Sequence, residues 1–196
     1  MEGPTHSLGG EEKVPRAPRL KDVSRLCAEL NRLEARYIVV GGFAVIQAGY
    51  ARFTDDIDLL IDTSLENEAR VFEALRSLPD QAVNELNPGD VEKFIVVRVG
   101  DEILVDLMRS GCGVNYAEAI KDAVYHELDG VKVPFASPQT LWRMKQTRRE
   151  KDIPDRLFLR TLLESEGILV EPAQNETAPG GDLMCRLKKF FSKGKK

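Results

Sequence analysis

VVGGFAVIQAGYARFTDDIDLLID, residues 39–62, contains two glycines after an apolar run and then two aspartates, Asp56 and Asp58, inside a second apolar run. The pattern predicts a short strand, a tight glycine turn into a short helical piece, and a second strand that includes both aspartates. Alternate residues of a strand point to the same face, so Asp56 and Asp58 project side by side. Neighbouring carboxylates repel each other unless a cation lies between them, and hard divalent ions prefer carboxylate oxygens. The segment therefore favours an Mg2+ site, although a D-x-D alone is more often a solvated strand end.

The glycines and the residues just before the aspartates suit an anion. Gly41 and Gly42 open the short helix, whose free backbone N–H groups and positive dipole end would face a polyphosphate, although a Gly pair alone equally fits a plain turn. Arg52 and Thr54 could meet phosphate oxygens or support the aspartates. A third acid, Asp106, lies in the aliphatic run ILVDLM, where a carboxylate is costly without a partner.

The rest of the chain alternates helical and extended patterns. Hydrophobic spacing predicts helices over residues 20–33, 65–78, 138–146 and 153–167, and further strands over 37–40, 93–99, 102–108, 123–128 and 131–136. Gly100-Asp101 and Asp129-Gly130 predict tight turns that pair the later strands as antiparallel hairpins. Ser137 is expected to cap the helix that begins at Pro138. The expected fold class is α/β (α+β): a small mixed sheet flanked by helices, with two C-terminal helices.

The 196 residues (21.9 kDa) predict one folded domain with extensions at both ends. We expect a disordered leader over residues 1–17, the domain over 18–168, a linker over 169–182 and a basic amphipathic tail over 183–196. The tail places its apolar residues on one helical face beside six Lys and Arg residues. It is interpreted as a loosely attached extension, and it also fits a helix that contacts an anionic membrane surface, a docking helix or a nucleic-acid arm.

Composition limits the function classes. A net charge of -4 and a pI near 5.4 give no overall attraction to nucleic acid or anionic membrane. The three cysteines, Cys27, Cys112 and Cys185, have neither disulfide-framework nor zinc-site spacing. No apolar run is long enough to span a membrane, and the N-terminal residues lack a signal-peptide core. We therefore expect a protein of the reducing cytoplasm.

Five polar residues of the predicted domain have simpler interpretations. Lys145 lies in RMKQTRREK, where a solvated position is commoner than a phosphate contact. Asp152 is interpreted as a helix cap at least as readily as a catalytic group. Strand alternation turns Asp55 away from the aspartate pair, and Asp62 is expected to cap at the strand exit. His126 has no second His or Cys nearby in sequence, so we expect a surface or half-buried position.

The motifs together resemble a known family. Two glycines, a spacer of about a dozen residues, D-hydrophobic-D and a later strand aspartate resemble the nucleotidyltransferase fold of the polymerase-β type. Residues 39–62 are similar to the abortive-infection (AbiEii-like) nucleotidyltransferases and their small bacterial relatives. Those proteins often continue with a helix that carries Lys and then a Lys-Asp pair, and Lys145, Lys151 and Asp152 follow that pattern. The resemblance covers roughly residues 20–168.

The resemblance implies a site and a reaction. It implies that Asp56 and Asp58 hold Mg2+ or Mn2+, that Asp106 is a further ligand or activates the attacking hydroxyl, and that the glycine turn binds the triphosphate. The implied reaction transfers a nucleoside monophosphate from an NTP to a hydroxyl of RNA, protein or a small molecule. The alternative is a catalytically inactive module that binds a nucleotide or a protein partner, of the toxin–antitoxin type.

Overall fold

The computed structural model describes residues 14–170 and 187–191. Its helices are α1 (Leu20–Arg32), α2 (Gly41–Gln47), α3 (Leu65–Leu75), α4 (Asp90–Phe94), α5 (Tyr116–Ala119), α6 (Pro138–Met144) and α7 (Ile153–Ser165), with short 3-10 turns at Ala82–Glu85 and Glu150–Asp152. Its strands are β1 (Tyr37–Val40), β2 (Asp56–Ile61), β3 (Val96–Gly100), β4 (Leu104–Met108), β5 (Ser110–Gly111), β6 (Val114–Asn115), β7 (Val124–Leu128), β8 (Val131–Phe135) and β9 (Leu187–Phe191).

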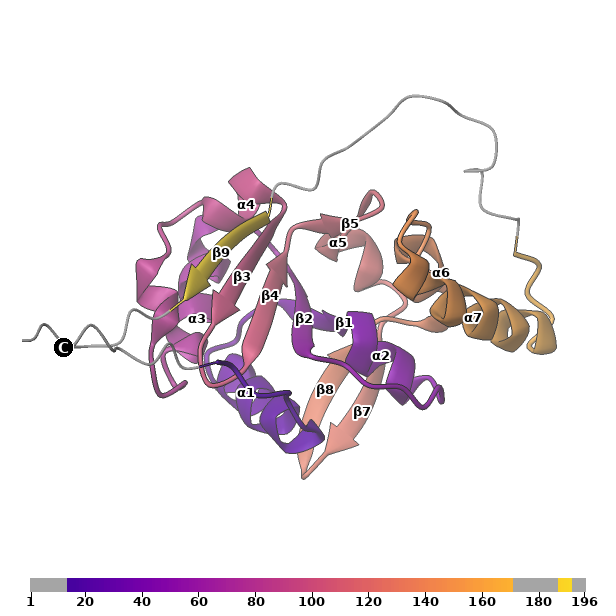
Figure 1. Ribbon diagram of the computed structural model, residues 1–196, viewed down its shortest axis with the longest axis horizontal. Coiled ribbons are helices and arrows are strands. Elements are labelled where there is room, and N and C mark those ends of the chain that lie inside the picture. The colour runs from indigo at the N-terminus through magenta and orange to yellow at the C-terminus, as the bar shows by residue number, and fades with distance from the viewer. Residues whose placement is uncertain (1–13, 171–186, 192–196) are drawn as a thin grey trace, which may run out of the picture.

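Seven strands form one mixed sheet in the order β7-β8-β1-β2-β4-β3-β9 (Figure 1). The pairs β1–β2, β3–β4 and β7–β8 are antiparallel, whereas β1–β8, β2–β4 and β3–β9 are parallel. Strands β5 and β6 form a separate small hairpin. The sheet and its flanking helices confirm the predicted fold class.

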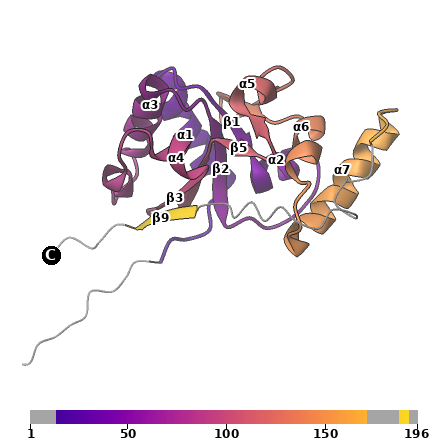
Figure 2. The ribbon, with the colours of Figure 1, turned by 90° about the horizontal axis from the view of Figure 1, so that it is seen from above.

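The core fills the space between the sheet and α1 and α3. The apolar stripe of α1 (Val23, Leu26, Cys27 and Leu30) is at most 1% exposed, and all four residues of β1 are buried. These apolar residues, which recur at helical spacing in the sequence, therefore form the buried face of α1. In Figure 2, α1 and α3 lie together at one end of the molecule and α6 and α7 at the other.

The two predicted hairpins have different turns. Asp129 and Gly130 both have positive φ (50° and 79°), as a tight two-residue hairpin turn requires, so this prediction is confirmed. The antiparallel hairpin predicted around Gly100-Asp101 is confirmed, but the position of its turn is wrong, because Gly100 is still in β3 and pairs with Leu104. Residues 101–103 form the connection instead, and the change of register places Arg98 opposite Asp106.

The cap at Ser137 is confirmed, since its Oγ accepts a hydrogen bond of 3.0 Å from the backbone N–H of Thr140. The predicted strand over residues 93–99 begins too early, because Lys93 and Phe94 belong to α4. Helices α4 and α5 and the β5–β6 hairpin were not predicted, and all of them are short. Such elements have too few residues for a periodic pattern.

Both chain extensions differ from expectation. Arg16, assigned to the disordered leader, forms a bridge with Ile103, and its guanidinium bonds to Asp22 and Glu102, so the folded part begins before residue 18. Residues 187–191 form β9 beside β3, so a helix is wrong for this part of the tail (Figure 1). Residues 1–13, 171–186 and 192–196 lie outside the described residues, and with them Cys185 and most of the linker.

Candidate functional site

The three predicted aspartates converge on one face of the sheet. Asp56 and Asp58 are the first and third residues of β2, and β4 runs parallel beside it with Asp106 opposite Asp58. Residues opposite each other in paired strands project to the same face. Each of the three offers a carboxylate oxygen, and these oxygens lie within 4.8 Å of one another. Three carboxylate oxygens at this separation have the ligand type and the spacing that a hard cation requires.

The glycine pair allows the start of α2 to pack directly against β2. Gly41 has φ +61°, and a Cβ on it would lie 1.8 Å from Oδ2 of Asp58. A Cβ on Gly42 would lie 2.2 Å from Oγ1 of Thr54. The backbone N–H of Gly42 donates a hydrogen bond to the Asp58 carboxylate. This N–H, which the sequence suggested for a phosphate, thus faces an anion of the protein itself.

Burial and two like charges raise the pKa of Asp58 to about 7. Burial is the largest cause, followed by repulsion from Asp56 and Asp106, while Lys145 and the Gly42 N–H oppose the shift. The surroundings of Asp58 therefore favour its protonated form over its ionised form. A cation among the three carboxylates would relieve this repulsion.

Arg98 of β3 contacts this cluster and was missed by the sequence analysis. Its Nε and Nη2 each donate to a different oxygen of Asp106 at 2.7 Å, and Nη2 also donates to Oδ2 of Asp56 at 2.7 Å. The Arg98 side chain is 23% exposed, and the carboxylates raise its pKa further. The sequence shows an Arg in the strand that precedes the strand of Asp106. The predicted two-residue turn between these strands did not place Arg98 opposite Asp106.

Lys145 is part of a buried ion network. Its Nζ lies 2.9 Å from Oδ1 of Asp152 and 3.0 Å from Oδ2 of Asp155, and its side chain is 14% exposed. Burial lowers the pKa of Lys145, but the two carboxylates outweigh this effect and the net shift is upward. The prediction of a solvated Lys145 is therefore wrong. Asp152 stands at the N-cap position of α7 without a side-chain cap bond, and it accepts from Lys145 and Thr147 instead.

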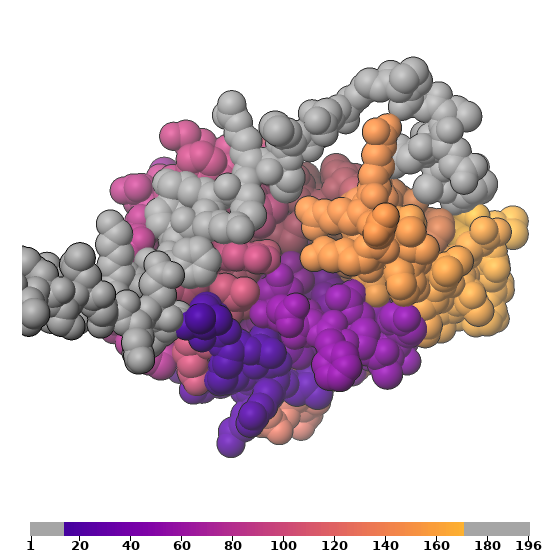
Figure 3. Space-filling model, viewed as in Figure 1, coloured from indigo at the N-terminus to yellow at the C-terminus, as the bar shows by residue number. Residues whose placement is uncertain are grey.

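Arg52 and Thr54 have different partners. Nη1 of Arg52 donates to Asp155, which is thereby shared between Arg52 and Lys145. Arg52 thus bonds to α7 and not to the aspartate cluster. In the view of Figure 3, the chain around residues 40–60 borders the C-terminal helices. Oγ1 of Thr54 donates to Asp56, to its backbone O at 3.2 Å and its Oδ1 at 3.4 Å. Thr54 therefore supports Asp56, one of the two roles expected of it.

The simpler interpretations of three residues hold. Asp62 accepts from the backbone N–H of Ser64 at 2.9 Å, the capping role predicted for it, and also from Arg36. Asp55 is exposed and lies outside the cluster of Asp56, Asp58 and Asp106. His126 is half-buried, with its ring edge-on to that of Phe135 at 5.7 Å between centroids.

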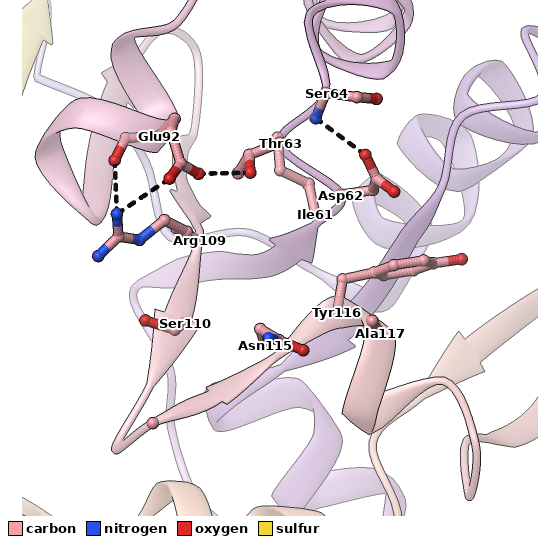
Figure 4. A pocket seen from close by; sticks show the side chains of 11 residues that line it. Ile61, Asp62, Thr63, Ser64, Glu92, Arg109, Ser110, Asn115, Tyr116 and Ala117 are labelled. Carbon is pink, nitrogen blue, oxygen red and sulfur yellow. Dashed lines mark hydrogen bonds and ion pairs between the residues drawn. The ribbon is translucent and has the colours of Figure 1, made fainter.

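A separate depression of about 450 Å³ lies at the far end of β2 and β4 (Figure 4). In it Glu92 lies between Arg109, whose Nη1 donates to Oε1 at 3.2 Å, and Thr63, whose Oγ1 donates to Oε2 at 2.5 Å. Asp58 is three residues from Ile61 at its edge, which corresponds to about 10 Å of strand. None of the three aspartates lines this depression, so the carboxylate cluster is a distinct site.

Comparisons with known proteins give similarities of fold only. No protein-family model and no curated protein matches the sequence. The solution structure of the antibiotic-resistance factor ANT(2'')-Ia is 15% identical, with a TM-score of 0.48 over 75% of this chain and 85% of that one. The crystal structure of ANT(2'')-Ia with adenylyl-2''-tobramycin is 17% identical (TM-score 0.47; 76% and 91%). An antigenic nucleotidyltransferase-like protein from Paracoccidioides brasiliensis is 20% identical (TM-score 0.44; 76% and 79%). At this level of similarity, function depends on the residues of the chain itself.

Proposed function

We propose that this protein is a nucleotidyltransferase that uses Mg2+ or Mn2+ to transfer a nucleoside monophosphate from an NTP to a hydroxyl of an RNA, protein or small-molecule acceptor. The observation that carries the proposal is the convergence of Asp56, Asp58 and Asp106 within 4.8 Å on neighbouring strands. Three carboxylates this close together on a sheet are costly unless cations compensate them, and Arg98 bonds to only two of the three.

The residues present fit a hard divalent ion. All three offer carboxylate oxygens, the ligand type that Mg2+ prefers. Burial is the main cause of the raised pKa of Asp58, and a cation would relieve the second cause, the repulsion from Asp56 and Asp106. When bound, such an ion neutralises the triphosphate and orients the phosphorus for in-line attack. We assign Asp56 and Asp58 as ligands and Asp106 as a ligand or as the base for the acceptor hydroxyl.

The surrounding residues hold these side chains in place. Thr54 bonds to Asp56, and the Gly42 N–H bonds to Asp58, so both are oriented before any ligand arrives. Lys145 is close enough to Asp58 to lower its pKa. In our proposal Gly41, Gly42, Arg52, Thr54 and Lys145 form the nucleotide-binding side. Lys145 and Arg52 would have to share their charge between Asp155 and a phosphate.

One observation favours a second candidate function. Arg98 already donates to both oxygens of Asp106 and to Asp56, and carboxylates held by a guanidinium are less available for the metal ions that transfer uses. A domain that binds nucleotide without turnover would act as a sensor or as one partner of a toxin–antitoxin pair. The two candidates differ in turnover and agree in nucleotide binding.

The deciding experiment incubates the full chain with each of the four labelled NTPs, Mg2+ or Mn2+, and pools of RNA, protein and small-molecule hydroxyls. We expect a labelled acceptor and released pyrophosphate. Asp56→Asn and Asp58→Asn should abolish transfer, whereas Asp62→Asn, a change at the exit of the same strand, should not. Metal-dependent NTP binding without transfer to any pool would favour the inactive module.

The proposal extends to the compartment and the partners of the protein. No helix within residues 14–170 is long and apolar enough to cross a membrane. A cytoplasmic location, a protein partner and a membrane-surface contact of the tail are each consistent with the sequence. The strand at residues 187–191 weakens the last of these, because a helical apolar face is absent there.

A further inference from the structure

The guanidinium of Arg98 takes up much of the bonding capacity of the carboxylate cluster. It bonds to both oxygens of Asp106 and to Oδ2 of Asp56, all at 2.7 Å. A planar guanidinium that bridges two carboxylates in this way is a strong and directional contact. Arg98 therefore occupies the part of the cluster formed by Asp106 and one edge of Asp56.

This position is fixed by the sheet. Arg98 lies opposite Asp106 in the antiparallel pair β3–β4, and Asp106 lies opposite Asp58 in the parallel pair β2–β4. All three side chains consequently project to one face, one strand apart. Only 23% of the Arg98 side chain is exposed. Water could therefore replace few of the hydrogen bonds that Arg98 donates to the carboxylates.

The oxygens that Arg98 leaves available belong to Asp56 and Asp58. Oδ1 of Asp56 has only a 3.4 Å contact from Thr54, and Asp58 accepts from the Gly42 N–H and has no bond to Arg98. One ion can bind to these oxygens with Arg98 in place. A second ion on Asp106 would have to displace Arg98 and would then lie beside its uncompensated charge.

We infer that Arg98 acts as the second cation of this site, so that the protein binds one divalent ion, on Asp56 and Asp58. Two-metal transfer sites place a second ion where the charge of the reacting groups is neutralised, and here the guanidinium supplies a fixed positive charge. The inference rests on the proposed function, because it takes the carboxylate cluster as a metal site. It replaces the ligand or base role proposed for Asp106 with the task of holding Arg98, which bonds to both of its oxygens.

The test is the number of ions bound. The full chain is titrated with Mn2+ alone at pH 8, and free ion is followed by electron paramagnetic resonance. We expect one bound Mn2+ per chain in the wild type and two in Arg98→Met, in which Asp106 becomes available. Arg36→Met is the matched control, since Arg36 pairs with Asp62 outside the cluster, and it should bind one.

Each result decides between the alternatives. Two ions in the wild type, or one ion with unchanged affinity in a folded Arg98→Met, would overturn the role of Arg98 and leave the proposed function standing. No bound ion in the wild type would remove the metal site and the proposed function together. Because Arg98→Met removes the cation that bonds to Asp56 and Asp106, circular dichroism must confirm its fold. Arg98→Lys, which cannot bridge both aspartates, should show a weak second site if Arg98→Met does not fold.

Discussion

A Cβ atom on Gly41 would lie 1.8 Å from Oδ2 of Asp58, far inside the closest approach of two non-bonded atoms. The glycine turn and the aspartate strand are therefore one structural unit and not two neighbouring motifs. Gly42 extends the relationship, because its N–H bonds to the same carboxylate. A side chain at position 41 would push Asp58 out of its place among the carboxylates.

We predict that Gly41→Ala destabilises the fold more than a glycine replacement that costs backbone strain alone. Positive φ costs an alanine about 1–2 kcal/mol, and the overlap with Asp58 adds roughly 1–3 kcal/mol. Gly113→Ala is the control, because Gly113 has φ +83° with nothing within 4 Å of the added Cβ. Urea unfolding of both variants measures the difference. Equal losses would show that the contact with Asp58 is easily relaxed.

We predict that, without divalent ions, stability falls as the pH rises from about 4 to about 7. Asp58 has its pKa raised from 3.8 to about 7 in the folded state, mainly by burial and then by Asp56 and Asp106. At this carboxyl the folded protein holds up to one more proton than the unfolded chain in this interval, and the stability that this proton contributes is lost as the pH rises through 7. Melting temperature against pH measures the slope, which Mg2+ should reduce near neutrality.

Asp58→Asn should remove the same pH dependence. Asn keeps an oxygen for the Gly42 N–H but carries no charge, so the variant should be more stable than the wild type at pH 8 by on the order of 2 kcal/mol. It should also lose the stabilisation by Mg2+. A variant that is less stable than the wild type in metal-free buffer at pH 8 would contradict this account of the site.

We predict that Lys145→Met is strongly destabilising, by about 3 kcal/mol, because Asp152 and Asp155 are left buried with less positive charge. Arg143→Met is the control. Arg143 pairs with Glu118 at the surface, where such a pair contributes at most about 1 kcal/mol. Thermal unfolding of the two variants compares them. The double variant Lys145→Met with Asp152→Asn should recover part of the loss.

We predict that a chain ending at residue 186 shows faster amide hydrogen exchange in β3. Removing β9 turns β3 into an edge strand, and edge strands exchange more readily, here by roughly tenfold. Mass spectrometry of peptides covering residues 96–100 measures the change. Peptides covering β7, at the opposite edge of the sheet, serve as the internal control and should not change. Unchanged exchange in β3 would mean that β9 gives it no protection in solution.

The long periodic elements and the Asp56–Asp58 pair could be predicted from local patterns of the sequence, whereas the convergence of Asp106 on that pair was implied only by the family resemblance. The apolar stripe of α1 recurs over several turns, and the apolar run of β2 places Asp56 and Asp58 two residues apart. Arg98 could not be placed, since its meeting with Asp106 depends on the length of one connection. Lys145 likewise looked like one of several surface cations, because its partner Asp155 reaches it through the packing of α6 on α7.

Asp155 holds Arg52 of the loop before β2 and Lys145 at the end of α6 with one carboxylate. A designer who wished to retarget the protein by exchanging its C-terminal helical pair would thereby also loosen the segment that leads to Asp56. Chimeras that graft new helices onto this sheet should therefore retain the acid at position 155 and its two basic partners.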